Sequence, residues 1–544
     1  MSLRRHRLIL ALLSLLAACA RGPAVTPGPL AGPESYDILI TGGTVIDGTG
    51  ASRFRADVAI SGDRIALVSP TPLSRERARR VIAATSRVVA PGFIDLHSHL
   101  DPLPQMPEAE SAVRQGVTTA VGGPDGSSPW PLGEYLAARE RQRIGINVAF
   151  LTGHNTIRRQ VMGMARRDPR PTELEQMRAM VARAMGEGAW GLSTGLKYLP
   201  GAWSKTDEVV ALSRVAADSG GIYTSHLREE GLGLIESVAE AIEIGRRARI
   251  PVVLTHHKAV GTPMWGKSVM TLAMVDSARR AGVDVSIDQY PYTATHTGIS
   301  VLIPEWAFDG GDTAFARRTR DPVLRDSIRK GIVFNILNDR GGGDLRRVQF
   351  SRVSWKRELE GRTLHDWAVM RGLAPTPETG ADLVVQAELE GGANAIYHVL
   401  DEGDVRRIMR HPHTMIASDG RLSRPGDGHP HPRAYGTFPR VLGHYVRDEK
   451  VLTLEQAVHK MTGMPAARMG FRDRGVLRPG AYADVVVFDP ARVADRATFA
   501  APHQYPTGIE FVLVNGVVEV DGERFIDARA GRVLRRSSVG ERGR

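Results

Sequence analysis

The chain has 544 residues, of which 42% are hydrophobic and 24% charged, a composition typical of a globular protein with a large core rather than a disordered chain. Its formal net charge is +11, but the arginines are scattered and no basic run carries interleaved aromatic residues, so the sequence disfavours nucleic-acid binding. The positive field is compatible with a small anionic substrate.

The N-terminus has the pattern of a bacterial lipoprotein signal peptide. Arginines precede the apolar run 8–16, and the only cysteine of the chain, Cys19, directly follows two small residues. The run is about half the roughly 20 apolar residues that span a bilayer. We therefore expect residues 1–19 to be a signal in which Cys19 is lipidated and anchors the exported protein to the cell envelope, at the periplasmic face. The alternative is an ordinary cleaved signal with a chance cysteine.

The rest of the chain holds no further cysteine, so the exported body must fold without disulfides. Residues 20–35 are rich in Gly, Pro and Ala and are predicted to form a flexible tether. Short alternating strands bounded by Gly and Asp then dominate 36–90 and recur in 472–535. We predict that these two ends pair into one small β-sandwich domain.

The middle of the chain, residues 91–471, alternates strand-like and helical runs, which is the pattern of parallel βα units. Eight such units predict a TIM-like (β/α)8 barrel, with its active site at the carboxyl ends of the strands. The stretch between the seventh and eighth strands, about 295–411, is predicted to be an insertion with its own helices. The candidate strands are 93–96, 116–121, 147–151, 191–194, 222–225, 252–255, 283–287 and 415–417.

Polar residues follow several of these strands at the positions that a barrel presents to its mouth. Imidazoles and carboxylates at separate strand ends indicate a metal centre, because neutral imidazole and carboxylate are ligands that zinc prefers. A lysine there can bridge two metals once it is carboxylated. Metals lower the pKa of bound water and polarise a carbonyl, and a nearby aspartate can move the proton. The residues are His97 and His99 after the first strand, Lys197 after the fourth, His226 after the fifth, His256 after the sixth and Asp419 after the eighth.

Motifs along nearly the whole mature chain resemble the amidohydrolase superfamily and, within it, the N-acyl-D-amino-acid deacylases (D-aminoacylases). The resemblance implies the barrel with a small β domain and a zinc-dependent hydrolase of N-acyl-D-amino acids or of dipeptides with a C-terminal D-residue. The motifs are PGFIDLHSH (91–99), GVTT (116–119), GLSTGLKYLPG (191–201), TSHLR (224–228), THHK (255–258), DQYPY (288–292), ASDG (417–420) and HPHPR (429–433).

The same resemblance implies residue roles. His226 and His256 would hold the tighter metal, His97 and His99 the other, and Asp419 would be the acid–base residue. Three further residues would clamp the α-carboxylate of the substrate, and charge-assisted donors suit that task. They are Tyr198, Lys258 and Arg433; the alternative for the last two is a structural ion pair.

The chain departs from the family at one ligand. Many D-aminoacylases have a metal-binding cysteine in an Asn-Cys-Gly turn, where this chain has Asp125 between Pro124 and Gly126. Either Asp125 binds the metal directly, or Lys197 bridges as a carbamate, as in dihydroorotases and hydantoinases. We favour Lys197 as the bridge. Asp125 would then contact one of the metal ligands rather than the metal itself. A carboxylated lysine favours two zinc ions, and a cysteine-type site one.

Two other functions remain open. A cyclic amidase of the hydantoinase or dihydroorotase type would suit a carboxylated Lys197, although the proposed carboxylate clamp suits linear substrates better. A non-catalytic binding lipoprotein is disfavoured by the complete set of candidate ligands. Among the neighbouring residues, His257 is predicted to pack away from the metals, and His429 and His431 to shape the loop that presents Arg433.

Overall fold

The computed structural model describes residues 35–536. The predictions for Cys19, for the signal peptide and for nearly all of the tether fall outside these described residues. Within residues 35–536, no helix is long and apolar enough to cross a membrane.

All eight predicted barrel segments are strands, and each boundary lies within two residues of its predicted position. They are buried on both faces, and most of them are short runs dominated by apolar residues, whereas β11 (GLSTG) and β12 (IYTSH) also bury polar side chains. Successive strands pair in parallel, first β6-β8-β9 and then β11-β12-β13-β14-β18. Their bounds are β6 (Phe93–Asp95), β8 (Val117–Gly122), β9 (Asn147–Phe150), β11 (Gly191–Gly195), β12 (Ile222–His226), β13 (Val252–Leu254), β14 (Val285–Gln289) and β18 (Thr414–Ile416).

Short strand extensions join the two sets of strands. After Leu151, β10 (Thr152–Gly153) continues the line of β9 and pairs in parallel with β11. On the other side, β7 (Ser98–His99) follows β6, β19 (Gly420–Arg421) follows β18, and the two pair in parallel. The last barrel strand therefore meets the first at their carboxyl ends, which brings the residues after both strands together.

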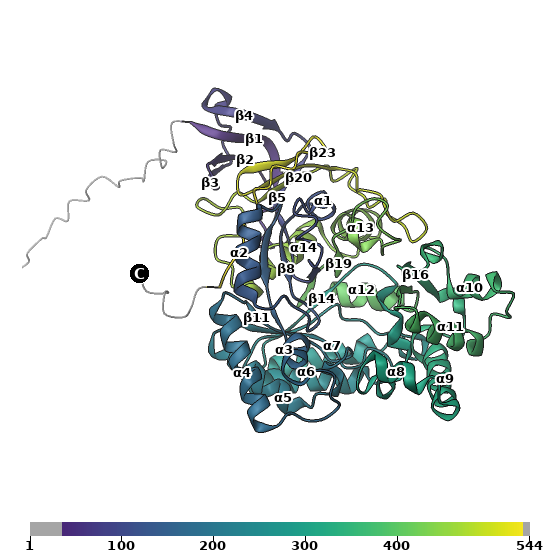
Figure 1. Cartoon of the computed structure of the whole chain (residues 1–544). Coiled ribbons are helices and arrows are strands. Elements are labelled where there is room, and N and C mark those ends of the chain that lie inside the picture. The colour runs from purple at the N-terminus through teal and green to yellow at the C-terminus, as the bar shows by residue number, and fades with distance from the viewer. Residues whose placement is uncertain (1–34, 537–544) are drawn as a thin grey trace, which may run out of the picture. The chain divides into compact units, whose positions relative to one another are not determined.

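Helices between the strands cover the outside of the barrel. In α6 the buried positions include Leu234, Val238, Ala241 and Ala248, a spacing that places one apolar stripe against the strands. Figure 1 shows α4 to α7 side by side in chain order, as their contacts require. The helices are α1 (Glu110–Val113), α2 (Leu132–Gln142), α3 (His154–Met162), α4 (Pro171–Gly186), α5 (Thr206–Asp218), α6 (Leu234–Ala248), α7 (Ser268–Arg280), α12 (Glu402–Arg410), α13 (Arg433–Arg440), α14 (Leu454–Met461) and α15 (Gly463–Met469).

Both ends of the described chain contribute to one nine-stranded sheet, in the order β23-β22-β21-β20-β5-β1-β2-β3 with β4 on β1. The join is the antiparallel pair of β5 and β20, so the predicted association of the two ends is present. The prediction of two packed sandwich layers stays a prediction. The strands are β1 (Tyr36–Val45), β2 (Phe54–Ser61), β3 (Arg64–Ser69), β4 (Ala78–Ala83), β5 (Val88–Pro91), β20 (Val485–Phe488), β21 (Ile509–Val514), β22 (Val517–Asp521) and β23 (Arg524–Phe525).

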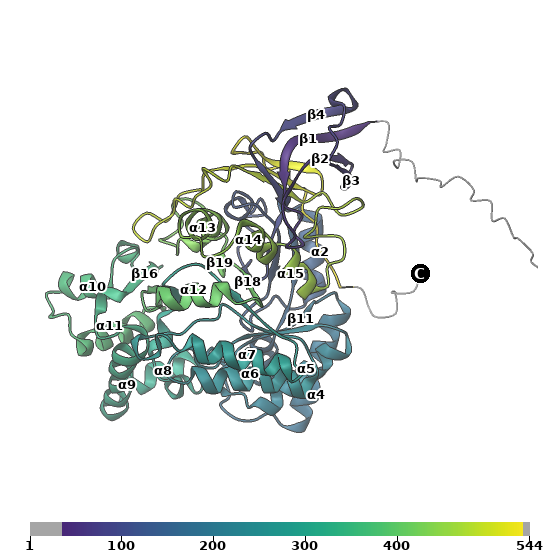
Figure 2. The ribbon, with the colours of Figure 1, turned by 180° about the vertical axis from the view of Figure 1, so that it is seen from behind.

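Residues between β14 and β18 form a separate substructure at the predicted insertion. It has its own three-stranded antiparallel sheet and its own apolar cluster, which includes Ile332, Phe350 and Trp367. Figures 1 and 2 both show its helices grouped at one side of the barrel. Its elements are β15 (Thr295–Gly298), α8 (Asp312–Arg318), α9 (Pro322–Asn335), β16 (Val348–Arg352), α10 (Leu364–Met370), α11 (Pro377–Leu389) and β17 (Asn394–Tyr397).

Candidate metal centre and active site

The carboxyl ends of the barrel strands bring four histidines and two aspartates into one buried cluster. His97 and His99 follow β6, Asp125 follows β8, His226 ends β12, His256 follows β13 and Asp419 follows β18. All are buried except His99, which is partly exposed. The ligand atoms form two groups, each spanning no more than 4.8 Å: His97, His99, Asp125 and Asp419 in one, and Asp125, His226 and His256 in the other.

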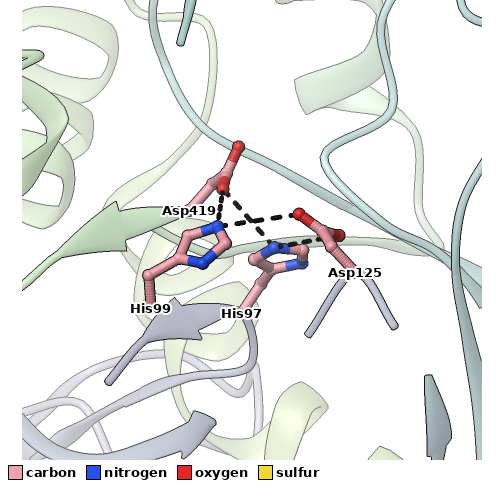
Figure 3. Close-up of side chains that lie close together, drawn as sticks. All are labelled: His97, His99, Asp125 and Asp419. Carbon is pink, nitrogen blue, oxygen red and sulfur yellow. Dashed lines mark hydrogen bonds and ion pairs between the residues drawn. The ribbon is translucent and has the colours of Figure 1, made fainter. Parts of the chain in front are cut away.

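The first group converges on the Nε2 atoms of its histidines (Figure 3). Oδ1 of Asp419 lies 3.0 Å from Nε2 of His99 and 3.4 Å from Nε2 of His97. Asp125 approaches the same two nitrogens from the other side, at 3.5 Å from His97 and 3.6 Å from His99. Two carboxylates thus face one histidine pair.

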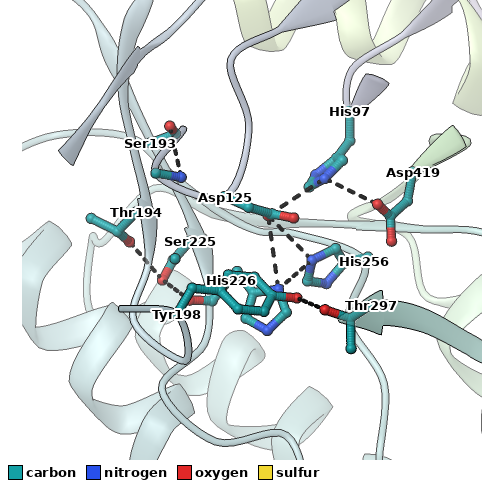
Figure 4. Close-up of polar contacts among 12 residues, drawn as sticks. His97, Asp125, Ser193, Thr194, Tyr198, Ser225, His226, His256, Thr297 and Asp419 are labelled. Atoms are coloured by element: carbon teal, nitrogen blue, oxygen red, sulfur yellow. Dashed lines mark hydrogen bonds and ion pairs between the residues drawn. The ribbon is translucent and has the colours of Figure 1, made fainter. Parts of the chain in front are cut away.

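The second group shares Asp125 with the first (Figure 4). Its Oδ1 lies 3.3 Å from Nε2 of His256 and 3.8 Å from Nδ1 of His226, and these two nitrogens are 2.8 Å apart. Asp125 is therefore positioned to bridge two cations, one on each side.

The hydrogen bonding around the cluster fits a cation. Both ring nitrogens of His97, Nε2 of His226 and Oδ1 of Asp125 are buried without a hydrogen-bond partner within the described chain. Buried polar atoms are normally paired, because leaving one unpaired costs about 1–3 kcal/mol. A donor set of imidazoles and carboxylates with free lone pairs suits zinc.

Three of these residues have left-handed backbone. Asp125 has φ 53°, His256 has φ 36° and Asp419 has φ 50°. Such conformations are uncommon for residues other than glycine and are retained where the surrounding structure demands them, often at functional sites. At these positions they turn the chain directly after a barrel strand.

The charges of the cluster are strongly coupled. Burial opposes ionisation of Asp125, but His97 and His256 outweigh it and hold its pKa well below the usual range. For Asp419 burial is likewise outweighed, first by Arg433, and its pKa is also held low. Burial lowers the pKa of His97, yet the two aspartates raise it well above its usual value. Both carboxylates are therefore ionised in this cluster.

Lys197, the favoured bridge in the sequence analysis, has a different neighbour. Its ammonium pairs with the carboxylate of Glu229. It contributes to the wall of a neighbouring cavity, whereas Asp125 contributes to the cavity over the histidines. The structure therefore brings Asp125, and not Lys197, to the centre of the ligand cluster, because the residues after β11 carry the lysine towards Glu229.

Glu230 is a site residue that the sequence analysis did not identify. It is 1% exposed, and its Oε1 accepts a hydrogen bond from Nζ of Lys258 at 2.5 Å and lies 3.2 Å from Nδ1 of His256. Burial opposes its ionisation, but Lys258 and the histidines hold its pKa well below the usual range. Its position in the sequence, four residues after the candidate ligand His226, could have indicated this role. Glu230 holds the predicted clamp residue Lys258, whose ammonium in turn contacts the candidate ligand His256.

The predicted clamp residues border the same site. Nη1 of Arg433 lies 2.7 Å from Oδ2 of Asp419, and the guanidinium lies over the ring of Tyr290. Nζ of Lys258 also donates to Nδ1 of His256 at 2.7 Å. Tyr198 packs its ring against His226, with its hydroxyl accepting a hydrogen bond from Thr297. A cavity of about 310 Å³ is lined by all three predicted clamp residues.

Two buried aspartates hold the backbone of the site. Asp95 accepts hydrogen bonds from the backbone and side chain of Ser418, next to Asp419, and Oδ1 of Asp288 accepts from the backbone NH of His256 at 2.6 Å. These hydrogen bonds hold the backbone in place at two candidate metal ligands, His256 and Asp419.

His257 and His431 behave as predicted, whereas His429 contacts the backbone carbonyl of Phe499, and its role in the loop that carries Arg433 stays a prediction. His257 points away from the cluster and forms a hydrogen bond with the hydroxyl of Thr271 on α7. Nδ1 of His431 accepts a hydrogen bond from the backbone NH of Arg433 at 3.0 Å, so it shapes the loop that carries the guanidinium.

Comparisons with known proteins identify the family of the chain. A family model described as the amidohydrolase family matches residues 80–307 and 339–520. The N-acyl-D-glutamate deacylase of Alcaligenes xylosoxydans xylosoxydans is 41% identical over 528 residues, which cover 93% of this chain and 98% of that protein. The D-aminoacylase of the same organism is 37% identical, over 93% of this chain and 99% of the relative.

A solved structure shows the same fold. The N-acyl-D-glutamate deacylase from Bordetella bronchiseptica, complexed with zinc and a phosphonate inhibitor that mimics the tetrahedral intermediate, matches with a TM-score of 0.78 and 38% identity. The match covers 92% of this chain and 100% of that one. This chain therefore belongs to the amidohydrolase family, in the group that contains the D-aminoacylases.

Proposed function

We propose that this protein is a zinc-dependent hydrolase that cleaves the amide of N-acyl-D-amino acids. The observation that carries the proposal is the buried cluster of four histidines with Asp125 and Asp419, next to the cations Lys258 and Arg433. The histidines and aspartates suit a metal centre with a carboxylate beside it, and the two cations would bind the anionic end of the substrate. The D preference rests on the names of the relatives.

Asp125 would bridge two metal sites, with His226 and His256 on one side and His97, His99 and Asp419 on the other. This assignment replaces a carboxylated Lys197, whose pairing with Glu229 gives it another function. When bound, zinc supplies Lewis-acid chemistry, which polarises a carbonyl and lowers the pKa of water. The site thus needs no lysine carbamate to hold two cations.

Asp419 would move the proton. Its Oδ1 faces the histidine pair, so it can accept a proton from the attacking water, and its Oδ2 is held by Arg433. The new carbon–oxygen bond forms as the water attacks and gives up this proton. As the carbon–nitrogen bond then breaks, the same carboxyl passes the proton to the departing nitrogen. The products are a carboxylate and a free amino acid.

Arg433 and Lys258 would bind the α-carboxylate. Both are buried cations, and a guanidinium and an ammonium give charge-assisted hydrogen bonds to a carboxylate. Each now pairs with an acidic residue, Asp419 or Glu230. These partners hold the cations in place before the substrate binds.

The cyclic amidase alternative loses its main support because Lys197 pairs with Glu229.

We also propose, from the sequence pattern alone, that Cys19 is lipidated and tethers the exported enzyme to the cell envelope, and that the nine-stranded sheet is a β-sandwich beside the barrel. Cell fractionation tests the anchor: the wild-type protein should be found with the membranes, and Cys19→Ser should not.

The experiment for the main proposal compares linear and cyclic amides. Zinc-reconstituted protein is given N-acetyl-D-glutamate and N-acetyl-D-methionine, with hydantoin and dihydroorotate in parallel. We expect release of amino acid from the linear compounds and no ring opening. Ring opening without deacylation would reject the proposal in favour of a cyclic amidase.

A further inference from the structure

A second and larger cavity lies beside the metal site. Its volume is about 780 Å³, compared with about 310 Å³ over the histidines. It lies between the loop after β11 and the insertion, and apolar side chains contribute much of its wall. They include Met164, Val301, Ile303, Trp306, Phe308 and Phe334.

The two cavities share a wall. Tyr198, Leu199, Thr297 and Gly298 line both of them. Tyr198 packs against the candidate ligand His226, with ring centroids 4.5 Å apart. A group attached to a carbonyl at the metal centre can therefore extend past Tyr198 into the larger space.

The charges orient a substrate across this wall. The lining of the metal cavity has as many basic as acidic side chains: Lys258, Arg340, Arg421 and Arg433 against Asp101, Asp125, Glu230 and Asp419. Cations held by the candidate metal ligands would add positive charge there. The larger cavity has two basic side chains and four acidic ones, of which Glu388 has a pKa raised by burial to about 7, and its lysine, Lys197, is already paired with Glu229. The carboxylate end of a substrate is therefore favoured in the metal cavity and disfavoured in the larger one.

Once the α-carboxylate lies at Lys258 and Arg433, two groups of the substrate still need space: the side chain of the amino acid, and the acyl chain on the other side of the carbonyl carbon. We propose that the larger cavity is the subsite for the acyl group and that it takes a long, uncharged, apolar acyl chain. This inference rests on the proposed deacylase function and adds the class of acyl group. The substrates are then N-acyl-D-amino acids with a medium- or long-chain fatty acyl group rather than acetyl alone.

The test is a chain-length series on one amino acid. We measure kcat/KM of the zinc-loaded protein for N-acetyl-, N-butanoyl-, N-octanoyl- and N-decanoyl-D-methionine. Each buried methylene contributes roughly a factor of two to four, so kcat/KM should rise at least about 60-fold over the six methylenes from acetyl to octanoyl. An N-lysyl dipeptide with the same D-residue tests whether the acidic wall selects a cationic group instead.

A bulky side chain in the cavity tests its location. Val301→Trp should lower the octanoyl-to-acetyl ratio of kcat/KM at least about tenfold, since it fills apolar space that the chain would occupy. The matched control is Val323→Trp, the same change at a residue on α9 that is 74% exposed, which should leave the ratio at the wild-type value. If Val301→Trp is inactive towards both substrates, the wild-type series decides alone.

Binding can be measured without turnover. A brominated fatty acid, 11-bromoundecanoate, should quench part of the tryptophan fluorescence of the wild-type protein, and Trp306→Phe should abolish that part because Trp306 lines the cavity. If N-acetyl-D-methionine is hydrolysed as well as the octanoyl compound, or the lysyl dipeptide is preferred, the inference is wrong while the deacylase function stands. If no N-acyl-D compound reacts, the proposed function itself fails.

Discussion

Asp125 is shared by both groups of candidate ligands, so replacing it with asparagine removes a charge from each metal site while keeping the side-chain shape. Its Oδ1 lies 3.3 to 3.8 Å from nitrogens of His97, His226 and His256. Losing an outer partner of a ligand typically weakens metal binding by about 10–100-fold. Loss of a bridging carboxylate should weaken zinc binding by at least about 100-fold, or about 2.7 kcal/mol.

The assay is the zinc content of Asp125→Asn after dialysis against a competing chelator, measured by plasma mass spectrometry. The control is Lys197→Gln, which removes the ammonium that pairs with Glu229 and should keep the wild-type zinc content. Circular dichroism checks that both variants are folded. Full zinc in Asp125→Asn together with loss of zinc in Lys197→Gln would refute this reasoning and restore a carboxylated lysine as the bridge.

Three further predictions concern binding and stability. Arg433→Lys should raise KM for N-acetyl-D-amino acids about 10- to 100-fold, because charge-assisted hydrogen bonds contribute roughly 1.5–3 kcal/mol; an unchanged KM in steady-state assays would reject the clamp. Glu230→Gln should lower kcat/KM about 10- to 100-fold by releasing Lys258, while the neighbouring change Glu229→Gln has a much smaller effect. Burial raises the pKa of Glu388 from its ordinary value of 4.5 to about 7. Between these two pH values the carboxyl is protonated in the folded protein but ionised in the unfolded chain, so the free energy of unfolding falls as pH rises from about 4.5 to 7. Glu388→Gln should therefore raise Tm at pH 8 and leave it nearly unchanged at pH 4, as calorimetry at the two pH values can check.

The barrel could be predicted because its strands are short apolar runs that end in polar residues. The candidate ligand histidines were identifiable because the residues just after a buried strand lie at the mouth of a barrel, although not every side chain there faces the opening, as His257 shows. One boundary error has a simple cause: the sequence placed a strand start at Val283, but its backbone NH still bonds to Ala278 at the end of α7. Local pattern alone does not reveal where a helix terminus stops accepting hydrogen bonds.

The choice between Asp125 and Lys197 could not be made from the sequence. Both follow barrel strands, and the difference lies in loop geometry: Asp125 has a positive φ that turns it towards the histidines, whereas Lys197 finds a carboxylate at Glu229. Pairing between strands far apart in the sequence could not be predicted either. Gly531 and Val533 were assigned to the small β domain, yet they pair with residues at and before β9 of the barrel.

The central claim is that Asp419 and the metal cluster hydrolyse the D-form of an N-acyl amino acid. Chiral chromatography of the products formed from racemic N-octanoyl-methionine tests it most directly, with zinc-loaded wild-type protein and Asp419→Asn side by side. We expect that D-methionine alone accumulates with the wild type and that Asp419→Asn, with its zinc still bound, releases at most about 1% as much, since the proton carrier contributes about 10²–10⁴-fold to the rate. Release of L-methionine, or equal release by both proteins, would contradict it.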